Sequence, residues 1–308
     1  MKESWIKFIN VGTIHFMSFP EVMKGEGPIV ETLEKILSNE FFTAVEITHI
    51  KDLKVREEVK KMLESSHVVS VYGAQPVLLS NKLNLNSLIE EERIRAVDEI
   101  KKCIEEAAYL GTKGVAVLSG PHPGKGLESE AIQKLLQSLE ELCDYSQKYK
   151  LKFELESFDF DVDKKCLIGK SELAADVARE VRKKYSNFGL ILDLSHFPLQ
   201  YEQTREALKN AIEFITHPHI GNCVLKDKSH PAYGDQHPRF GVEGGESDVE
   251  QVREFLATLF ELGWLKDERI KSEDKPIISF EVKPMAGEKS SIVLANSIRV
   301  FKEAWASL

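Results

Sequence analysis

The segment LKFELESFDFDVDKKCLIGKSELAADVAREVRKKYSNFGLILDLSH, residues 151–196, contains the pattern that decides the fold. It begins with an apolar run at 151–157, continues into an amphipathic charged stretch at 171–185 and returns to an apolar run at 189–195. Apolar residues at i, i+3, i+4 and i+7 in the middle stretch predict a helix with one buried side. Strand, helix and strand in this order are typical of a βα unit in a parallel sheet.

The same unit repeats along the whole chain. We predict strands at 8–14, 43–49, 68–73, 114–120, 151–157, 189–195, 221–227 and 277–283. Helical patterns lie at 29–39, 55–66, 91–111, 129–149, 171–185, 204–215, 248–264 and 293–307. Eight such units predict a (β/α)8 barrel, with a doubly wound open sheet as the alternative. Because no linker or composition break divides the chain, we predict the α/β class and a single TIM barrel domain over residues 1–308.

Composition restricts the partners of this chain. The 41 basic and 50 acidic side chains leave a net charge of −9, which repels polyanions, so we expect no nucleic-acid partner. The four cysteines form no C-x-x-C pair and are too sparse for a secreted disulfide scaffold. No apolar run approaches about eighteen residues, so we expect no membrane partner. These observations favour a cytoplasmic protein.

Three predicted strands each carry a carboxylate near their carboxyl end. Alternation along the strands places Glu156, Asp193 and Glu281 opposite the apolar faces that meet the helices. In a barrel these three side chains point to one place, at the end where active sites lie. Confined anions repel unless they are protonated or neutralised by a cation. A divalent metal ion is therefore the prediction, and structural ion pairs with neighbouring lysines are the alternative.

These carboxylates occur together with three short motifs, D-x-x-H at 193–196, a K-D turn at 226–227 and G-x-x-G-G-E-x-D at 241–248. Together they resemble the xylose-isomerase-like TIM barrels, a superfamily of sugar isomerases and epimerases, inosose-processing enzymes and endonuclease IV. The resemblance implies one divalent metal ion, with Mn²⁺ as the first choice and Mg²⁺, Co²⁺ or Zn²⁺ as alternatives. It also implies that Glu156, Asp193, Glu281 and one histidine bind this ion.

The histidine does not follow from position. The place where the family has it falls on Val224, and we expect His219 to lie at the wrong end of its strand. The segment SHPAYGDQHPRFG (229–241) resembles the endonuclease IV loop that carries an Asp and a His. We therefore expect His237 to supply the imidazole, with His230 as the second choice and with Asp235 orienting a ligand or water.

The remaining site assignments combine position with the resemblance. The predicted catalytic residues are Glu156, Glu281 and Lys283, and the predicted substrate-binding residues are His196, Lys226, Asp235 and Arg239. Lys283 shares the inward face with Glu281 and could stabilise an enolate oxygen. Each assignment has a structural alternative, such as an ion pair for Lys283, a turn for Lys226 and a helix cap for His196.

The predicted reaction is proton abstraction next to a carbonyl, in an isomerisation or epimerisation of a neutral sugar or keto-sugar. A neutral carbohydrate is expected because PHPGKG (121–126) lacks the spacing of a phosphate-binding loop. A second reading rests on the runs at 156–172, 193–199, 230–241 and 279–284, which resemble the catalytic subunits of C-glycoside deglycosidases. Those enzymes act on 3-keto-glycosides with a small accessory subunit, and a homo-oligomer is the other expectation. Endonuclease IV-like zinc phosphodiester hydrolysis and a non-catalytic sugar-binding barrel are the remaining alternatives.

Overall fold

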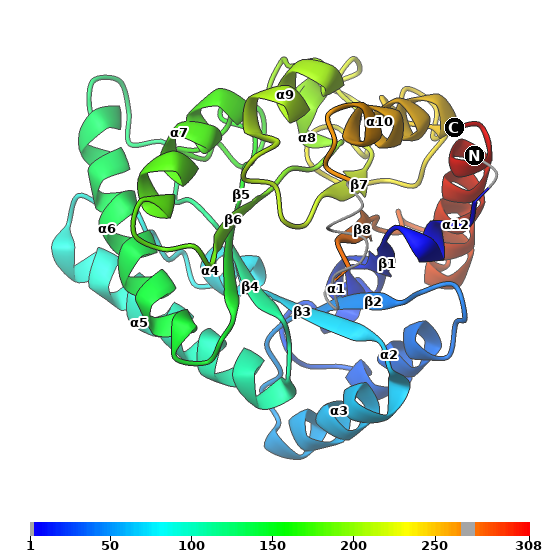
Figure 1. Ribbon diagram of the computed structural model, residues 1–308, viewed down its shortest axis with the longest axis horizontal. Coiled ribbons are helices and arrows are strands. Elements are labelled where there is room, and N and C mark those ends of the chain that lie inside the picture. Colours follow the sequence, from blue (N-terminus) through cyan, green and yellow to red (C-terminus); the bar gives the residue numbers. More distant parts are fainter. Residues whose placement is uncertain (1–2, 266–274) are drawn as a thin grey trace.

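Short apolar strands form the centre of the molecule in the computed structural model, which describes residues 3–265 and 275–308 (Figure 1). Most strand residues are buried, because one face of each strand meets the helices and the other faces the barrel interior. The strands are β1 (Asn10–Thr13), β2 (Ala44–Ile47), β3 (Val69–Gly73), β4 (Gly114–Leu118), β5 (Lys152–Glu156), β6 (Phe188–Ile191), β7 (His219–Gly221) and β8 (Ile277–Glu281).

The strands pair in parallel and follow one another around a ring. Continuous pairing gives one sheet in the order β2-β3-β4-β5-β6 and a second in the order β1-β8-β7. Single parallel bridges join the two sheets at both seams, Ile14 with Glu46 after β1 and Asp193 with His219 after β6. The predicted α/β barrel fold is therefore confirmed, and its strand order is the chain order.

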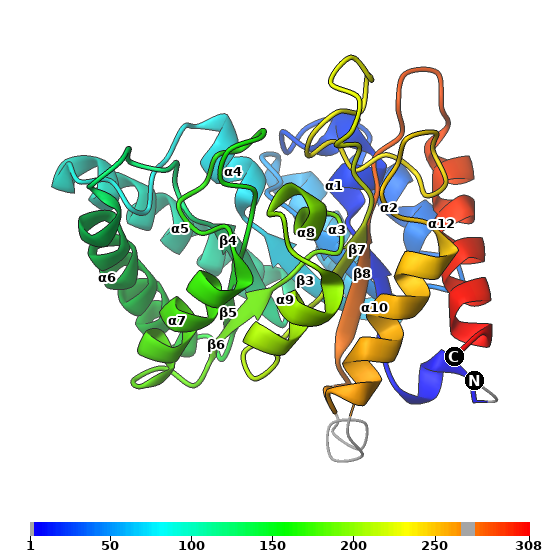
Figure 2. The same ribbon diagram turned by 90° about the horizontal axis from the view of Figure 1, so that it is seen from above.

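Amphipathic helices surround the strands (Figures 1 and 2). The longer ones are α2 (Ile29–Leu37), α3 (Leu53–Ser66), α5 (Glu90–Leu110), α6 (Glu128–Gln147), α7 (Ser171–Arg182), α9 (Thr204–Ala211), α10 (Val249–Glu261) and α12 (Ser290–Ala306). Shorter turns of helix are η1 (Trp5–Lys7), α1 (His15–Ser18), η2 (Pro20–Val22), α4 (Gln75–Ser80) and α8 (His196–Leu199). Within residues 3–265 and 275–308, no helix has both the length and the apolar run needed to cross a membrane.

Local signals in the sequence fix where several helices begin. Asp248 caps α10 and forms a capping box with Gln251, which satisfies backbone N–H groups that have no partner inside the helix. Asp52 caps α3 in the same way, accepting from the backbone N–H groups of Lys54 and Val55.

The seventh strand differs from the prediction. We expected a strand over 221–227, but β7 covers only His219–Gly221. After Gly221 the chain leaves the barrel, because Asn222 donates to the Arg239 carbonyl and accepts from the backbone of Ser247. Val224 then bridges to Tyr233 and Gly245. The apolar residues of this segment are therefore buried under the loops that follow β7 and not by the barrel wall.

Candidate metal centre

The three predicted carboxylates meet at the carboxyl ends of their strands. Glu156 ends β5, Glu281 ends β8, and Asp193 lies two residues beyond β6. All three are buried. Together with His219 each offers one ligand atom, and these four atoms lie within 4.8 Å of one another. Of the residues predicted for the metal site, the structure thus brings Glu156, Asp193 and Glu281 into one group.

His219 occupies the place that we expected another histidine to fill. Its Nδ1 lies 3.0 Å from Glu281 Oε2 and 3.3 Å from Glu156 Oε1. The expectation that His219 lies at the wrong end of its strand is wrong. β7 has only three residues and pairs with β8 from Ser279 to Glu281, and His219 also bridges to Asp193. Val224 lies outside the barrel wall, so it does not mark the position of a missing ligand.

The donor set fits a divalent cation. Glu156 Oε1 and Asp193 Oδ2 are buried and accept no hydrogen bond within the described residues, so each keeps a lone pair for a cation. Gly221 keeps the space beside them open, since a Cβ there would lie 3.0 Å from Asp193 Oδ1 and from His237 Nδ1. Three carboxylate oxygens and one imidazole nitrogen suit Mn²⁺ and Zn²⁺ alike.

The electrostatics of the group also favour a cation. Burial alone would lower the pKa of His219, but the Glu156 and Glu46 carboxylates beside it raise that pKa well above its ordinary value. Burial raises the pKa of Glu46 to about 7. It also raises the pKa of Asp193. Several buried carboxylates therefore share one imidazole, which is the situation that a bound metal ion relieves.

A second cluster lies next to this group and is built around Asp235. Asp235 Oδ1 accepts from His237 Nε2 at 2.8 Å and from His196 Nε2 at 3.0 Å, while Oδ2 lies 2.8 Å from Lys164 Nζ. Burial would raise the pKa of Asp235, but the charges of His237, Lys164 and His196 hold it well below its usual range. A lysine ammonium thus already neutralises the carboxylate that a second metal ion would need.

His237 lies between the two groups. Its Nε2 is 3.4 Å from Glu281 Oε1 as well as 2.8 Å from Asp235 Oδ1. Its backbone has a φ of 48°, a left-handed conformation that only the surrounding loop contacts can hold in a histidine. The loop 229–241 therefore lies over this end of the barrel, where Figure 2 shows it in yellow. His237 lies nearer to Asp235 than to Glu281.

Three of the predicted substrate-binding residues, His196, Lys226 and Arg239, have other partners in the structure. His196 is fully buried behind Asp235, and both of its ring nitrogens are used, by the Ser157 carbonyl and by Asp235. The Lys226 side chain is 80% exposed and pairs with Glu246. Arg239 pairs with Glu288. Direct substrate contact stays a prediction for these three, and none of them lines the cavity beside Glu156 and Glu281.

A cavity of about 180 Å³ opens onto the metal group. Its lining includes charged and polar side chains, namely Glu46, Gln75, Ser80, Glu156, Lys164, Asp235, Gln236, His237, Glu281 and Lys283. Lys283 Nζ donates to Gln236 Oε1 at 2.9 Å, and burial lowers the pKa of this lysine. The apolar residues of the lining are Ile14, Phe16, Met17, Met23, Pro76, Leu79 and Phe158. The cavity therefore offers both polar and apolar contacts to a small ligand.

A larger groove of about 920 Å³ lies outside the barrel, between α3, α4 and α5. It is lined by exposed charged side chains and by the His49–Glu106 pair, at 2.8 Å. It contains none of the metal-group residues. We therefore place the chemistry in the smaller cavity, where buried titratable groups converge.

Sequence reasoning missed Glu46 and Lys164, and it did not foresee the contact that Gln75 makes. Glu46 lies on β2, where the alternation used for Glu156 also predicts an inward side chain. Gln75 is the first residue of α4. It donates from Nε2 to Glu156 Oε2 at 2.8 Å and so fixes that carboxylate. Lys164 belongs to the irregular segment after β5, and its approach to Asp235 carries no local signal in the sequence.

A carboxylate-rich group at the carboxyl ends of barrel strands defines a TIM barrel protein with a metal-type site. The chain belongs to the xylose isomerase-like TIM barrel family, whose model matches residues 39–271. A curated relative, the inosose isomerase of Bacillus subtilis (strain 168), is 27% identical over 201 residues, which cover 61% of this chain and 70% of the relative.

Solved structures give the same fold. A D-tagatose 3-epimerase-like protein superposes with a TM-score of 0.70 at 20% identity, over 96% of this chain and 99% of the other. The IolI protein, solved with a bound zinc atom, superposes with a TM-score of 0.69 at 18% identity, over 97% of both chains. At these identities the two structures support the fold alone.

Proposed function

We propose that this protein is a divalent-metal-dependent sugar isomerase or epimerase that abstracts a proton next to a carbonyl of a neutral sugar or keto-sugar. The observation that carries the proposal is the buried group of Glu156, Asp193, His219 and Glu281 with its two unpartnered carboxylate oxygens. The inosose isomerase relative supports the same class of reaction. Mn²⁺ is the metal that we expect, and Zn²⁺, Co²⁺ and Mg²⁺ are alternatives.

The proposed ligands are Glu156, Asp193, His219 and Glu281. When bound, a divalent ion polarises the hydroxyl and carbonyl oxygens of a sugar and so acidifies the carbon-bound proton between them. Glu156 and Glu281 then act as the base and the acid, one removing the proton and the other returning it. Because Gln75 holds Glu156 at 2.8 Å, the carboxylate keeps a fixed direction toward the cavity.

Lys283 and His237 are the proposed partners of the oxygen on which negative charge develops. Both line the cavity, and the Lys283 ammonium is fixed by Gln236 at 2.9 Å. A positive charge held in a dry site stabilises an enolate oxygen more than it would in water. The apolar lining residues of the cavity, which include Phe16 and Phe158, help to exclude water from the reacting carbon.

The apolar residues that line the cavity also favour a second candidate function, that of a lyase that acts on a 3-keto-glycoside. In that reaction the base removes the proton next to the ketone, and the electron pair forms a double bond to the neighbouring carbon. The bond from that carbon to the aglycone breaks, and the departing group takes up a proton. An aromatic aglycone would lie against Phe16, Met17 and Phe158.

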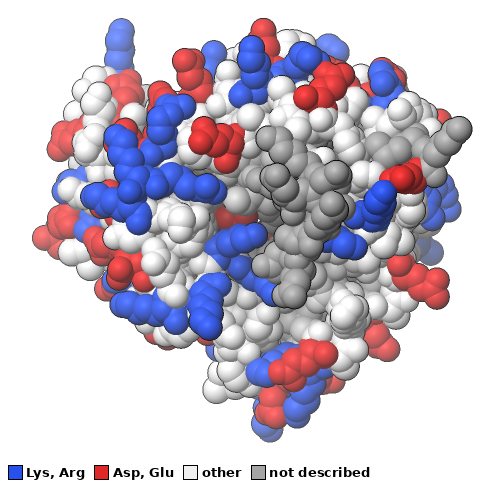
Figure 3. Space-filling model, viewed as in Figure 1, with Lys and Arg blue, Asp and Glu red and all other residues white. Residues whose placement is uncertain are grey.

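Endonuclease IV-like hydrolysis is less favoured. The net charge is −9, which repels a polyanionic substrate. Figure 3 shows acidic and basic side chains intermixed on one face of the molecule. A non-catalytic sugar-binding barrel is the remaining alternative, and it would bind a sugar without exchanging the proton next to the carbonyl.

Hydrogen–deuterium exchange tests the proposal without knowledge of the product. The Mn²⁺-loaded protein is incubated in D2O with a panel of neutral ketoses, inososes and 3-keto-glycosides, and deuterium at the carbon next to the carbonyl is measured by NMR. We expect incorporation with at least one panel member, and loss of incorporation in Glu281→Gln with metal still bound. Aglycone release in the same samples would favour the lyase. Absence of exchange across the whole panel by the metal-loaded protein would contradict the proposal.

A further inference from the structure

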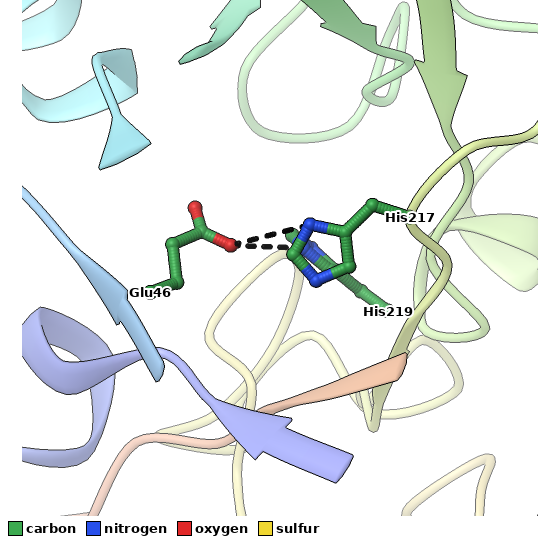
Figure 4. Close-up of side chains that lie close together, drawn as sticks. All are labelled: Glu46, His217 and His219. Carbon is green, nitrogen blue, oxygen red and sulfur yellow. Dashed lines mark hydrogen bonds and ion pairs between the residues drawn. The ribbon is translucent and has the colours of Figure 1, made fainter. Parts of the chain in front are cut away.

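The His219 ring has a second carboxylate on the side facing away from the metal group. Figure 4 shows Glu46, from β2, pointing across the barrel to His219 and His217. Glu46 Oε2 lies 3.2 Å from His219 Nε2, whereas His219 Nδ1 faces Glu281 and Glu156. Glu46 is 1% exposed. The imidazole is therefore held between carboxylates at both of its nitrogens.

These contacts decide which nitrogen can bind a metal ion. An ionised carboxylate only accepts hydrogen bonds, so the contact with Glu46 requires His219 Nε2 to donate. An imidazole that binds a metal ion is neutral and has one donor and one acceptor nitrogen, so in that form the lone pair of His219 lies on Nδ1. That nitrogen points to Glu156, Asp193 and Glu281. Glu46 thus selects the tautomer that presents its lone pair to the metal group.

The packing around Glu46 keeps it in this position. A Cβ at Gly73 would lie 2.6 Å from Glu46 Oε1, so the glycine of β3 leaves room for the carboxylate. The His217 ring stands at 86° to the His219 ring, with centroids 4.8 Å apart, and His217 Nε2 hydrogen-bonds Ser279 Oγ at 2.7 Å. His219 therefore has a packed neighbour on its ring as well as a fixed acceptor at Nε2.

We propose that Glu46 is a positioning residue for the metal centre, which orients His219 through Nε2 and so raises the affinity of the site for a divalent ion. The inference rests on the proposed metal-dependent function, but it concerns metal binding and not the identity of the sugar. Partners of metal-bound histidines typically contribute about 10- to 100-fold in metal affinity.

The test is a titration of metal-free protein with Mn²⁺ alone, in which calorimetry measures the binding. We expect Glu46→Ala to weaken Mn²⁺ binding by about 10- to 100-fold. Glu46→Gln keeps an acceptor oxygen at the same reach, so its loss should be smaller. Glu46→Asp keeps the charge but withdraws it from Nε2, so its loss should match that of Ala. Glu154→Gln, a change to another buried carboxyl of the barrel interior, is the control and should bind Mn²⁺ as the wild type does.

The outcomes separate the two proposals. No Mn²⁺ binding by the wild type would contradict the proposed function itself. Wild-type binding together with unchanged affinity in Glu46→Ala would overturn the positioning role, as would an equal loss in Glu154→Gln. If Glu46→Ala does not fold, as judged by circular dichroism, the order of the Gln and Asp variants decides: a loss in Gln that exceeds the loss in Asp overturns the inference. A crystal with Mn²⁺ bound to Glu46 itself would overturn it as well.

Discussion

Replacing Asp235 by Asn tests the buried charge that organises the loop over the barrel end. Asparagine keeps the size of the side chain and one acceptor oxygen but removes the negative charge. Asp235 is 4% exposed, and its three partners His196, His237 and Lys164 lie at 2.8 to 3.0 Å. The variant therefore leaves three donors of a buried cluster without their anion.

The magnitude follows from the shift of His196. Burial lowers the pKa of this imidazole, but the charge and hydrogen bond of Asp235, together with the charges of Asp193 and Glu156, outweigh burial and raise that pKa from 6.5 to about 10. That rise corresponds to on the order of 5 kcal/mol, shared with Asp193 and Glu156. Removing one partner of a buried pair typically costs about 3–5 kcal/mol. We expect this loss in the free energy of unfolding, and a melting temperature roughly 5–8 °C lower for a chain of 308 residues.

The effect also has a predicted pH dependence. The pKa of His196 is raised on folding, so its contribution is fully present below pH 6.5 and is lost as pH rises through about 10. The pKa of Asp235 is depressed, so its contribution is present above 3.8 and is lost as pH falls further. The stability difference between wild type and Asp235→Asn should therefore be widest between about pH 4 and 6.5 and should narrow toward pH 10.

Urea unfolding of the metal-free proteins in chelator, at several values of pH, measures this difference directly. Asp161→Asn is the control, because Asp161 is exposed in the segment before Lys164 and its change should stay within about 0.5 kcal/mol. A difference for Asp235→Asn below about 1 kcal/mol at pH 6 would refute the reasoning. A difference that widens as the pH rises would refute it as well.

Three further predictions follow from the site and its surroundings. Removal of metal with a chelator should abolish deuterium exchange, and Mn²⁺ should restore it; exchange that persists in metal-free protein, checked by elemental analysis, would contradict the role of the metal. Lys226→Ala should leave the exchange rate unchanged, because the side chain is 80% exposed and lies outside the cavity; a tenfold loss would return Lys226 to the site. Gly189→Ala should lower stability by about 1–3 kcal/mol in urea unfolding, since a Cβ would lie 2.3 Å from the Thr216 side chain; an unchanged midpoint would contradict the close approach.

Much of the fold and part of the site could be predicted because a strand has a period of two residues. That period alone directs Glu156, Asp193 and Glu281 inward once their strands are recognised. The same rule directs Glu46 of β2 inward, although that strand carries none of the motifs that mark the other three carboxylates.

The remaining site residues depend on tertiary contacts that no local pattern contains. The start of β7 was placed too late because the apolar residues around Val224 suggested a strand, whereas they are buried by the loops beyond it. Because the predicted strand began at residue 221, His219 was not predicted as a metal ligand. Lys164 reaches Asp235 over 71 positions of sequence, and only the folded chain brings the two together.

The central claim is that Glu156, Asp193, His219 and Glu281 hold one divalent metal ion. A crystal grown with Mn²⁺, with anomalous data collected at the manganese edge, tests it most directly. We expect one peak per chain, at roughly 2.0–2.3 Å from an oxygen of each carboxylate and from His219 Nδ1. A peak on His196, Asp235 and His237 instead, or no peak at a saturating Mn²⁺ concentration, would contradict it.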